Sequence, residues 1–200
     1  MAQAGIASEL TARWQRLAST WGAPAEVVDA VYADVVTRYG EPHRRYHTLE
    51  HIAEVLAVVD ELDGGVEVEW AGWLHDVIYD VRAADSEARS AGYAGEVLAQ
   101  LRAPDDVIRE VQRLIELSAT HAVVGGDKNG AIFVEADLAI LLSPPERYDR
   151  YARDVRAEYA HVDDDAWRSG RRAVLEALLS RATDERARSN VARELATLSS

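Results

Sequence analysis

The sequence predicts an all-α protein that folds as a helical bundle, and three observations support this prediction. Apolar residues recur at intervals of three and four along most of the chain, which is the period of one face of an α-helix. Proline and capping residues stand where these series begin, and glycine stands where several of them end. The 200 residues with 48% hydrophobic content are enough for one core. We therefore expect a single domain over residues 1–200.

The first half of the chain predicts four helices, taken here in order. The series from Ile6 to Trp21 forms the first. Pro24 suits the first turn of the second helix, which ends at Gly40. The third runs from about Thr48 to the Asp63-Gly64-Gly65 stop. The fourth is the apolar segment 68–80, VEWAGWLHDVIYD, which we expect to lie at the centre of the core.

The second half continues the helical pattern with one long loop. Asp85 and Ser86 open one helix, and Pro104 opens the next. The stretch 121–130, HAVVGGDKNG, is expected to be a loop. The apolar run 131–142 fits a strand or a helix, and its helical neighbours favour helix. Ser143-Pro144-Pro145-Glu146 has the form of a capping box, and further helices are expected from about Asp163 and Asp184.

Composition limits the kinds of ligand and partner. A formal charge of -13 repels polyanions, so we expect no extended contact with nucleic acid. Without cysteine, a metal ion must be held by His, Asp and Glu. The chain shows neither an export signal nor an apolar run long enough for a membrane span, so we expect a cytoplasmic protein. The oligomeric state is open, with a homodimer as one candidate.

Three short motifs contain residues that suit a metal site. His47 and His51 are four positions apart, and we expect them to be neighbours on one face of a helix. His75-Asp76 and Asp137 lie in very apolar segments, where a carboxylate is costly to bury without a cation. Each motif also has a structural explanation, such as an idle histidine pair or an aspartate paired with arginine. A metal shared by His51, His75, Asp76 and Asp137 explains all of them together.

The ordered series YGEPHRRYHTLEHI, LHDVIYD, ADSEARSA, SATH, EADLAILL, YDRYARDVRAEYA and SGRRAVLEALL resembles the HD-domain superfamily of metal-dependent phosphohydrolases over nearly the whole chain. The resemblance implies an all-α bundle that binds one or two divalent ions between the helices carrying these motifs. It also implies that metal-bound water attacks a phosphate ester of a small phosphorylated substrate, with a nucleotide as the expected class. The ion is open among Mn, Zn, Co, Ni, Fe and Mg.

A more distant similarity to cyclic-nucleotide phosphodiesterases makes His51 a metal ligand and His47 the general acid. Thr48 stands where those enzymes have asparagine. Asp80 is expected to orient the attacking water, or else to face solvent at a helix end. Arg44, His121 and Glu87 are assigned to substrate binding, and for His121 the alternatives are an extra metal contact and loop anchoring.

Two other functions remain open from the sequence. One is an O₂-dependent di-iron oxygenase of the HD fold, which needs more histidines between Asp76 and Asp137 than the single His121 found there. The other is a non-catalytic HD domain that binds a metal ion or a nucleotide as a sensor.

Overall fold

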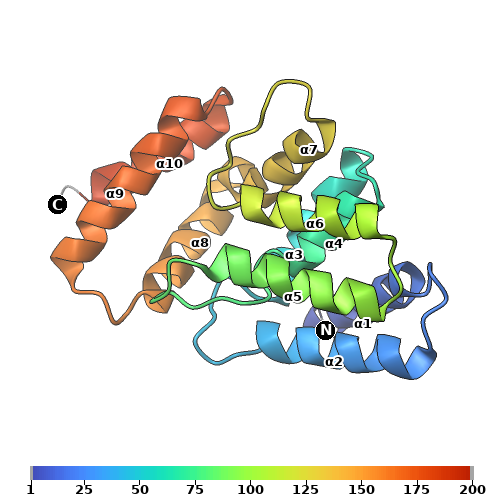
Figure 1. The fold of residues 1–200 in the computed structure, drawn as a ribbon. Helices are drawn as coiled ribbons and strands as arrows, with labels where there is room; N and C mark the ends of the chain where they lie inside the picture. The colour runs from blue at the N-terminus through green and yellow to red at the C-terminus, as the bar shows by residue number, and fades with distance from the viewer. Residues whose placement is uncertain (1, 199–200) are drawn as a thin grey trace. The chain divides into compact units, whose positions relative to one another are not determined.

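The structure is a computed structural model that describes residues 2–198, and every regular element in that range is a helix. The prediction of an all-α protein is confirmed (Figure 1). Contacts divide the chain into two compact units, residues 1–137 and 138–200, which are described in turn. The expectation of a single domain stays a prediction. Within residues 2–198 no helix is both long and apolar enough to cross a membrane.

Unit 1 is built around one short apolar helix, α4. The helix α4 (Val66–Leu74) packs against four of the other helices of the unit, namely α3, α5, α6 and α7 (Figure 1). Its side chains are buried on all sides, as the apolar sequence predicts. The other helices of this unit are α1 (Ala2–Ala18), α2 (Ala25–Tyr39), α3 (Leu49–Glu61), α5 (Ser86–Gln100), α6 (Asp105–Leu117) and α7 (Lys128–Asp137).

A tryptophan cluster fixes α4 against α1. The Trp14 ring meets Trp70 and Trp73 edge-on, with ring centroids 5.1 and 5.2 Å apart. The Trp14 indole nitrogen donates to the carbonyl of Val28. All three rings are fully buried, and edge-to-face pairs add to the stabilisation that burial gives. The C-terminal end of α4 is therefore held by the core.

The predicted helix starts and stops in unit 1 are largely confirmed. Pro24 and Pro104 occupy the N-cap positions of α2 and α6, and Gly40 is the C-cap of α2. The Thr48 hydroxyl accepts the backbone N–H of Glu50 and so caps α3. Local chain chemistry is sufficient to place these boundaries.

The predicted helix over residues 68–80 is wrong in its second half, because α4 ends at Leu74. The backbone that follows is satisfied by side chains instead of helical hydrogen bonds. The Arg44 guanidinium donates to the carbonyls of Asp76 and Val77. The Ser90 hydroxyl accepts the Ile78 N–H and donates to the Ile78 carbonyl. Because these distant side chains satisfy the backbone hydrogen bonds, the segment can form a tight turn although its apolar pattern is that of a helix.

The loop and helix predicted before Asp137 are confirmed with a shifted boundary. The loop covers residues 121–127, and α7 begins at Lys128, three residues earlier than the apolar run. The Asp127 carboxylate accepts the N–H of Gly130 and so caps the first turn of α7. Asp137 is the last residue of this helix.

Unit 2 consists of a 3₁₀ turn and three helices. They are η1 (Leu138–Leu142), α8 (Pro145–Glu158), α9 (Asp164–Arg181) and α10 (Glu185–Thr197). The Asp163 and Asp184 side chains cap α9 and α10, as predicted. The capping box at Ser143 is wrong: Pro144 takes the N-cap position, and the Ser143 hydroxyl donates to the Ile140 carbonyl.

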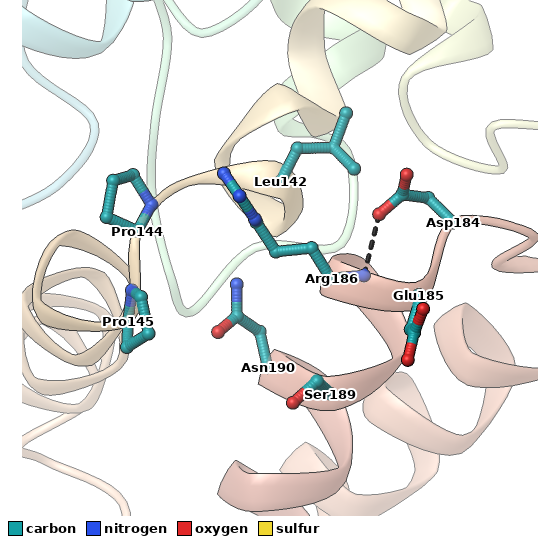
Figure 2. Close-up of a pocket in the computed structure, with 8 residues that line it drawn as sticks. All are labelled: Leu142, Pro144, Pro145, Asp184, Glu185, Arg186, Ser189 and Asn190. Carbon is teal, nitrogen blue, oxygen red and sulfur yellow. Dashed lines mark hydrogen bonds between the residues drawn. The ribbon is translucent and has the colours of Figure 1, made fainter.

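An open pocket in unit 2 lies between the start of α8 and the start of α10 (Figure 2). Asn190 is buried at its floor and donates to the carbonyls of Leu141 and Ser143, so its amide is used by the fold. Asp184 caps α10 from the rim. The pocket includes none of the residues that the sequence predicts for the site.

Candidate metal centre

Three of the predicted ligands, from three separate helical segments, converge in unit 1. His51 lies in the first turn of α3, His75 follows α4, and Asp137 ends α7. The Nε2 atoms of His51 and His75 are 3.2 Å apart. The Asp137 Oδ1 atom is 3.5 Å from the first and 3.4 Å from the second. The ligand atoms of this buried group all lie within 4.8 Å of one another, so the group could hold a metal ion.

Asp76 approaches both imidazoles, although it is not one of the three residues whose ligand atoms all lie within 4.8 Å of one another. Its Oδ2 atom is 3.0 Å from His75 Nε2 and 3.6 Å from His51 Nε2. The carboxylates of Asp76 and Asp137 thus approach the same two imidazole nitrogens. Residues as far apart in the chain as His51 and Asp137 meet at one point.

The donor spacing fits a small divalent cation. With metal–ligand bonds of about 2.1 Å, neighbouring ligand atoms lie about 3.0 Å apart at a right angle and about 3.4 Å apart at the tetrahedral angle. The separations among the imidazole nitrogens and carboxylate oxygens run from 3.0 to 3.6 Å. Imidazole nitrogen and carboxylate oxygen suit Zn, Mn, Fe and related ions.

The hydrogen bond on the far side of the His75 ring supports the same interpretation. His75 Nδ1 lies 3.1 Å from the carbonyl oxygen of Gly72. A carbonyl only accepts, so Nδ1 carries a hydrogen and Nε2 is directed at the carboxylates. Metal-binding histidines usually donate their second ring N–H in this way, which fixes the ring and its tautomer.

The charges of the site favour a cation at its centre. Burial alone would lower the pKa of His75, but the carboxylates of Asp76 and Asp137 outweigh it and hold this pKa well above its usual value. Burial likewise opposes ionisation of the two carboxyls, yet the neighbouring histidines lower the pKa of both. A proton on His75 therefore compensates the negative charge of the two carboxylates. A metal ion between the same groups would compensate this charge in the same way.

His47 lies beside this group, although not on the helix with His51. The expected shared helical face is wrong because Thr48 caps α3 and the helix starts only at Leu49. The two rings are nevertheless 5.9 Å apart. The His47 ring stacks on Tyr79 at 4.2 Å, and its charge helps to lower the pKa of Asp76. The imidazole is held next to the carboxylates.

Arg44 occupies a different place from the one expected for a substrate contact. Its side chain has no exposed surface. The guanidinium donates to the backbone carbonyls of His47, Asp76 and Val77, and to the Glu41 carboxylate. All of these acceptors belong to the protein itself. The structure therefore places the Arg44 guanidinium in the interior, behind the backbone of His47 and Asp76, and it is not exposed to a ligand.

His121 contacts the site through Asp137. Its Nε2 atom is 3.0 Å from Asp137 Oδ2, the oxygen that does not face His51 and His75. The His121 backbone has φ +51°, a left-handed conformation that costs energy in a residue with a β-carbon. The contact with the Asp137 carboxylate is made from this strained backbone position at the start of the loop.

Asp80 and Glu87 are not part of the convergent group. Asp80 was expected at the end of the helix predicted over residues 68–80, which is wrong because α4 has already ended. It lies exposed in a turn and accepts the N–H of Arg82. Glu87 lies half-buried in the first turn of α5. Their predicted roles toward water and substrate stay predictions.

Two contributors were not found from the sequence. The Gly72 carbonyl orients His75, and the only available signal was its position three residues earlier, one turn back in the helix. Tyr79 stacks between the rings of His43 and His47, and it was counted only as part of an apolar segment.

No family model matches this chain, and no curated protein and no solved structure is significantly similar to it. The resemblance to HD-type phosphohydrolases therefore depends on the sequence motifs alone.

Proposed function

We propose that this protein is a metal-dependent hydrolase of the HD type that cleaves a phosphate ester of a small phosphorylated metabolite, with a nucleotide as the expected class. The observation that carries the proposal is the convergence of His51, His75 and Asp137 at 3.2 to 3.5 Å, with Asp76 at 3.0 to 3.6 Å from the two imidazole nitrogens. These residues would hold a divalent cation, which supplies Lewis acidity toward a phosphoryl oxygen and toward water.

The remaining side chains suit acid catalysis beside that cation. His47 is half-buried, is oriented by its stack on Tyr79, and lies next to the carboxylates. A protonated imidazole there can donate its proton to the leaving oxygen of an ester. His121 keeps the outer oxygen of Asp137 engaged, so that the inner oxygen faces the histidines. Without a cation the carboxylates would repel a phosphate, so the metal decides whether substrate binds.

The test is a phosphate-release assay on purified protein loaded in turn with Mn, Zn, Co, Ni, Fe and Mg, against a panel of nucleotides and phosphomonoesters. We expect turnover with at least one ion, and its loss in Asp76→Asn. The matched control is Glu135→Gln, an exposed acid in α7, which should keep full activity. His47→Gln should lower kcat by about 10²- to 10⁴-fold at unchanged metal content.

The other outcomes favour the alternative functions. Metal binding without turnover over the whole panel would favour a sensor. Oxygen consumption coupled to product formation in the iron-loaded protein would favour an oxygenase.

A further inference from the structure

The geometry points to Arg44 as a positioning residue of the metal centre, whose guanidinium ties the segment carrying His47 and His51 to the turn carrying His75 and Asp76. The inference rests on the proposed metal centre, although not on turnover. Arg44 Nη1 donates to the Asp76 carbonyl at 2.7 Å and to the His47 carbonyl at 3.1 Å. One nitrogen thus joins the backbones of two residues that are far apart in the sequence.

The second nitrogen extends the link along the turn. Arg44 Nη2 donates to the Val77 carbonyl at 3.1 Å, and Nε donates to the Glu41 carboxylate at 3.1 Å. Since α4 ends at Leu74, the carbonyls of Asp76 and Val77 have left the helical hydrogen-bond ladder. The position of the turn, and with it the direction of the Asp76 side chain, therefore depends on these donors.

Packing fixes the plane of the guanidinium. Its Cζ lies 5.0 Å from the centre of the Tyr39 ring and 5.4 Å from that of Tyr79. The Tyr39 hydroxyl donates to the Trp73 carbonyl, so this ring is itself anchored to α4. Cation–π contacts on a desolvated guanidinium restrict its rotation as well as stabilise it. Arg44 is held rigidly enough to define where its partners lie.

Lysine cannot reproduce this arrangement. An ammonium group carries three donors on one atom, whereas the guanidinium spreads its donors over a planar fork that reaches several acceptors at fixed angles. Lysine at this position would keep the positive charge but reach fewer of the three carbonyls. The substitution Arg44→Lys therefore separates the loss of charge from the loss of geometry.

The test measures Co²⁺ binding to the full chain by calorimetry, together with the visible absorption spectrum at saturation. We expect Arg44→Lys and Arg44→Met to bind Co²⁺ about 10- to 100-fold more weakly, as replacements of groups that orient metal ligands usually do. The absorption bands of the bound ion should also shift, because displaced ligands change its coordination. The neighbouring exposed Arg45 supplies the control, and Arg45→Lys should match the wild type.

The spectrum distinguishes positioning from a general loss of stability. A merely structural arginine would lower the melting temperature of the variants, while the folded molecules kept the wild-type Co²⁺ affinity and band positions. That result would overturn the inference and leave the metal centre in place. Wild-type protein that binds no Co²⁺ would overturn both the metal centre and the role of Arg44. If Arg44→Met does not fold, Arg44→Lys and Glu41→Ala, which removes the acceptor of Nε, decide the matter by the same two readouts.

Discussion

Asp137→Asn should abolish most of the stabilisation that a bound metal ion gives to this protein. The substitution keeps the shape of the side chain and removes its charge, so it weakens the metal site with little disturbance of packing. In the wild type, Oδ1 of this carboxylate lies within 3.5 Å of both imidazole nitrogens. An amide oxygen in the same place is a far weaker ligand for a divalent ion.

The magnitude follows from linkage between binding and folding. At a metal concentration 100 times the wild-type Kd, the wild type gains about 2.7 kcal/mol. For a chain of this size that is a rise in melting temperature of about 5–10 °C. If loss of the carboxylate weakens binding by about 100-fold, the gain falls to about 0.4 kcal/mol. The corresponding rise is about 1 °C.

The assay is thermal unfolding with and without metal, in which each variant is compared with its own metal-free form. This comparison cancels the change that the substitution makes in the metal-free protein. Glu135→Gln, two residues earlier in α7 and exposed, should show the full wild-type rise. A wild-type rise in Asp137→Asn, or an equal loss in Glu135→Gln, would refute the assignment of Asp137 as a ligand.

Two further substitutions test ion pairs outside the candidate metal centre, one in each unit. Arg113 hydrogen bonds lower the pKa of Asp127, so this stabilisation is complete above the ordinary value of 3.8 and is lost as the pH falls through the lower folded value. Asp127→Asn should cost less than about 1 kcal/mol at pH 7, because Arg113 is largely exposed, and this cost should shrink as the pH falls below 3.8. Urea unfolding over a series of pH values measures this, and a cost that does not fall in acid would contradict it. Glu194→Gln breaks the buried pair with Arg171 in unit 2 and should cost about 3 kcal/mol. A loss below 1 kcal/mol by the same method would speak against that pair.

Most of the helices and the four candidate metal ligands could be predicted because their signals are local. A helix start such as Thr48 is determined by its own side chain and the next few residues. Asp76 and Asp137 are recognisable because a carboxylate stands out in an apolar segment. A buried carboxylate needs a cationic partner whatever the rest of the fold is. The sequence therefore indicates the ligands without any knowledge of their distances.

The remaining features depend on contacts between distant segments. The end of α4 at Leu74 is decided by donors and acceptors on Arg44 and Ser90, which no local pattern connects to it. Arg44 itself was assigned to substrate because sequence gives its charge and its nearness to His47, while burial decides its partners. The sequence showed that an arginine lies near the site, but it did not show which way its side chain points.

The side chains of the candidate metal centre are also held by contacts that do not involve a metal ion. His75 can carry the positive charge between Asp76 and Asp137, because both carboxylates raise its pKa. Its ring is held from behind by Gly72, and α4 is held by the Trp14 cluster, neither of which involves the metal. Zinc fingers differ in this respect, since their ligands come together only when the ion binds. Because the Gly72 carbonyl and the Trp14 cluster hold this region, we expect substitutions among the four residues to alter metal affinity more than they alter folding.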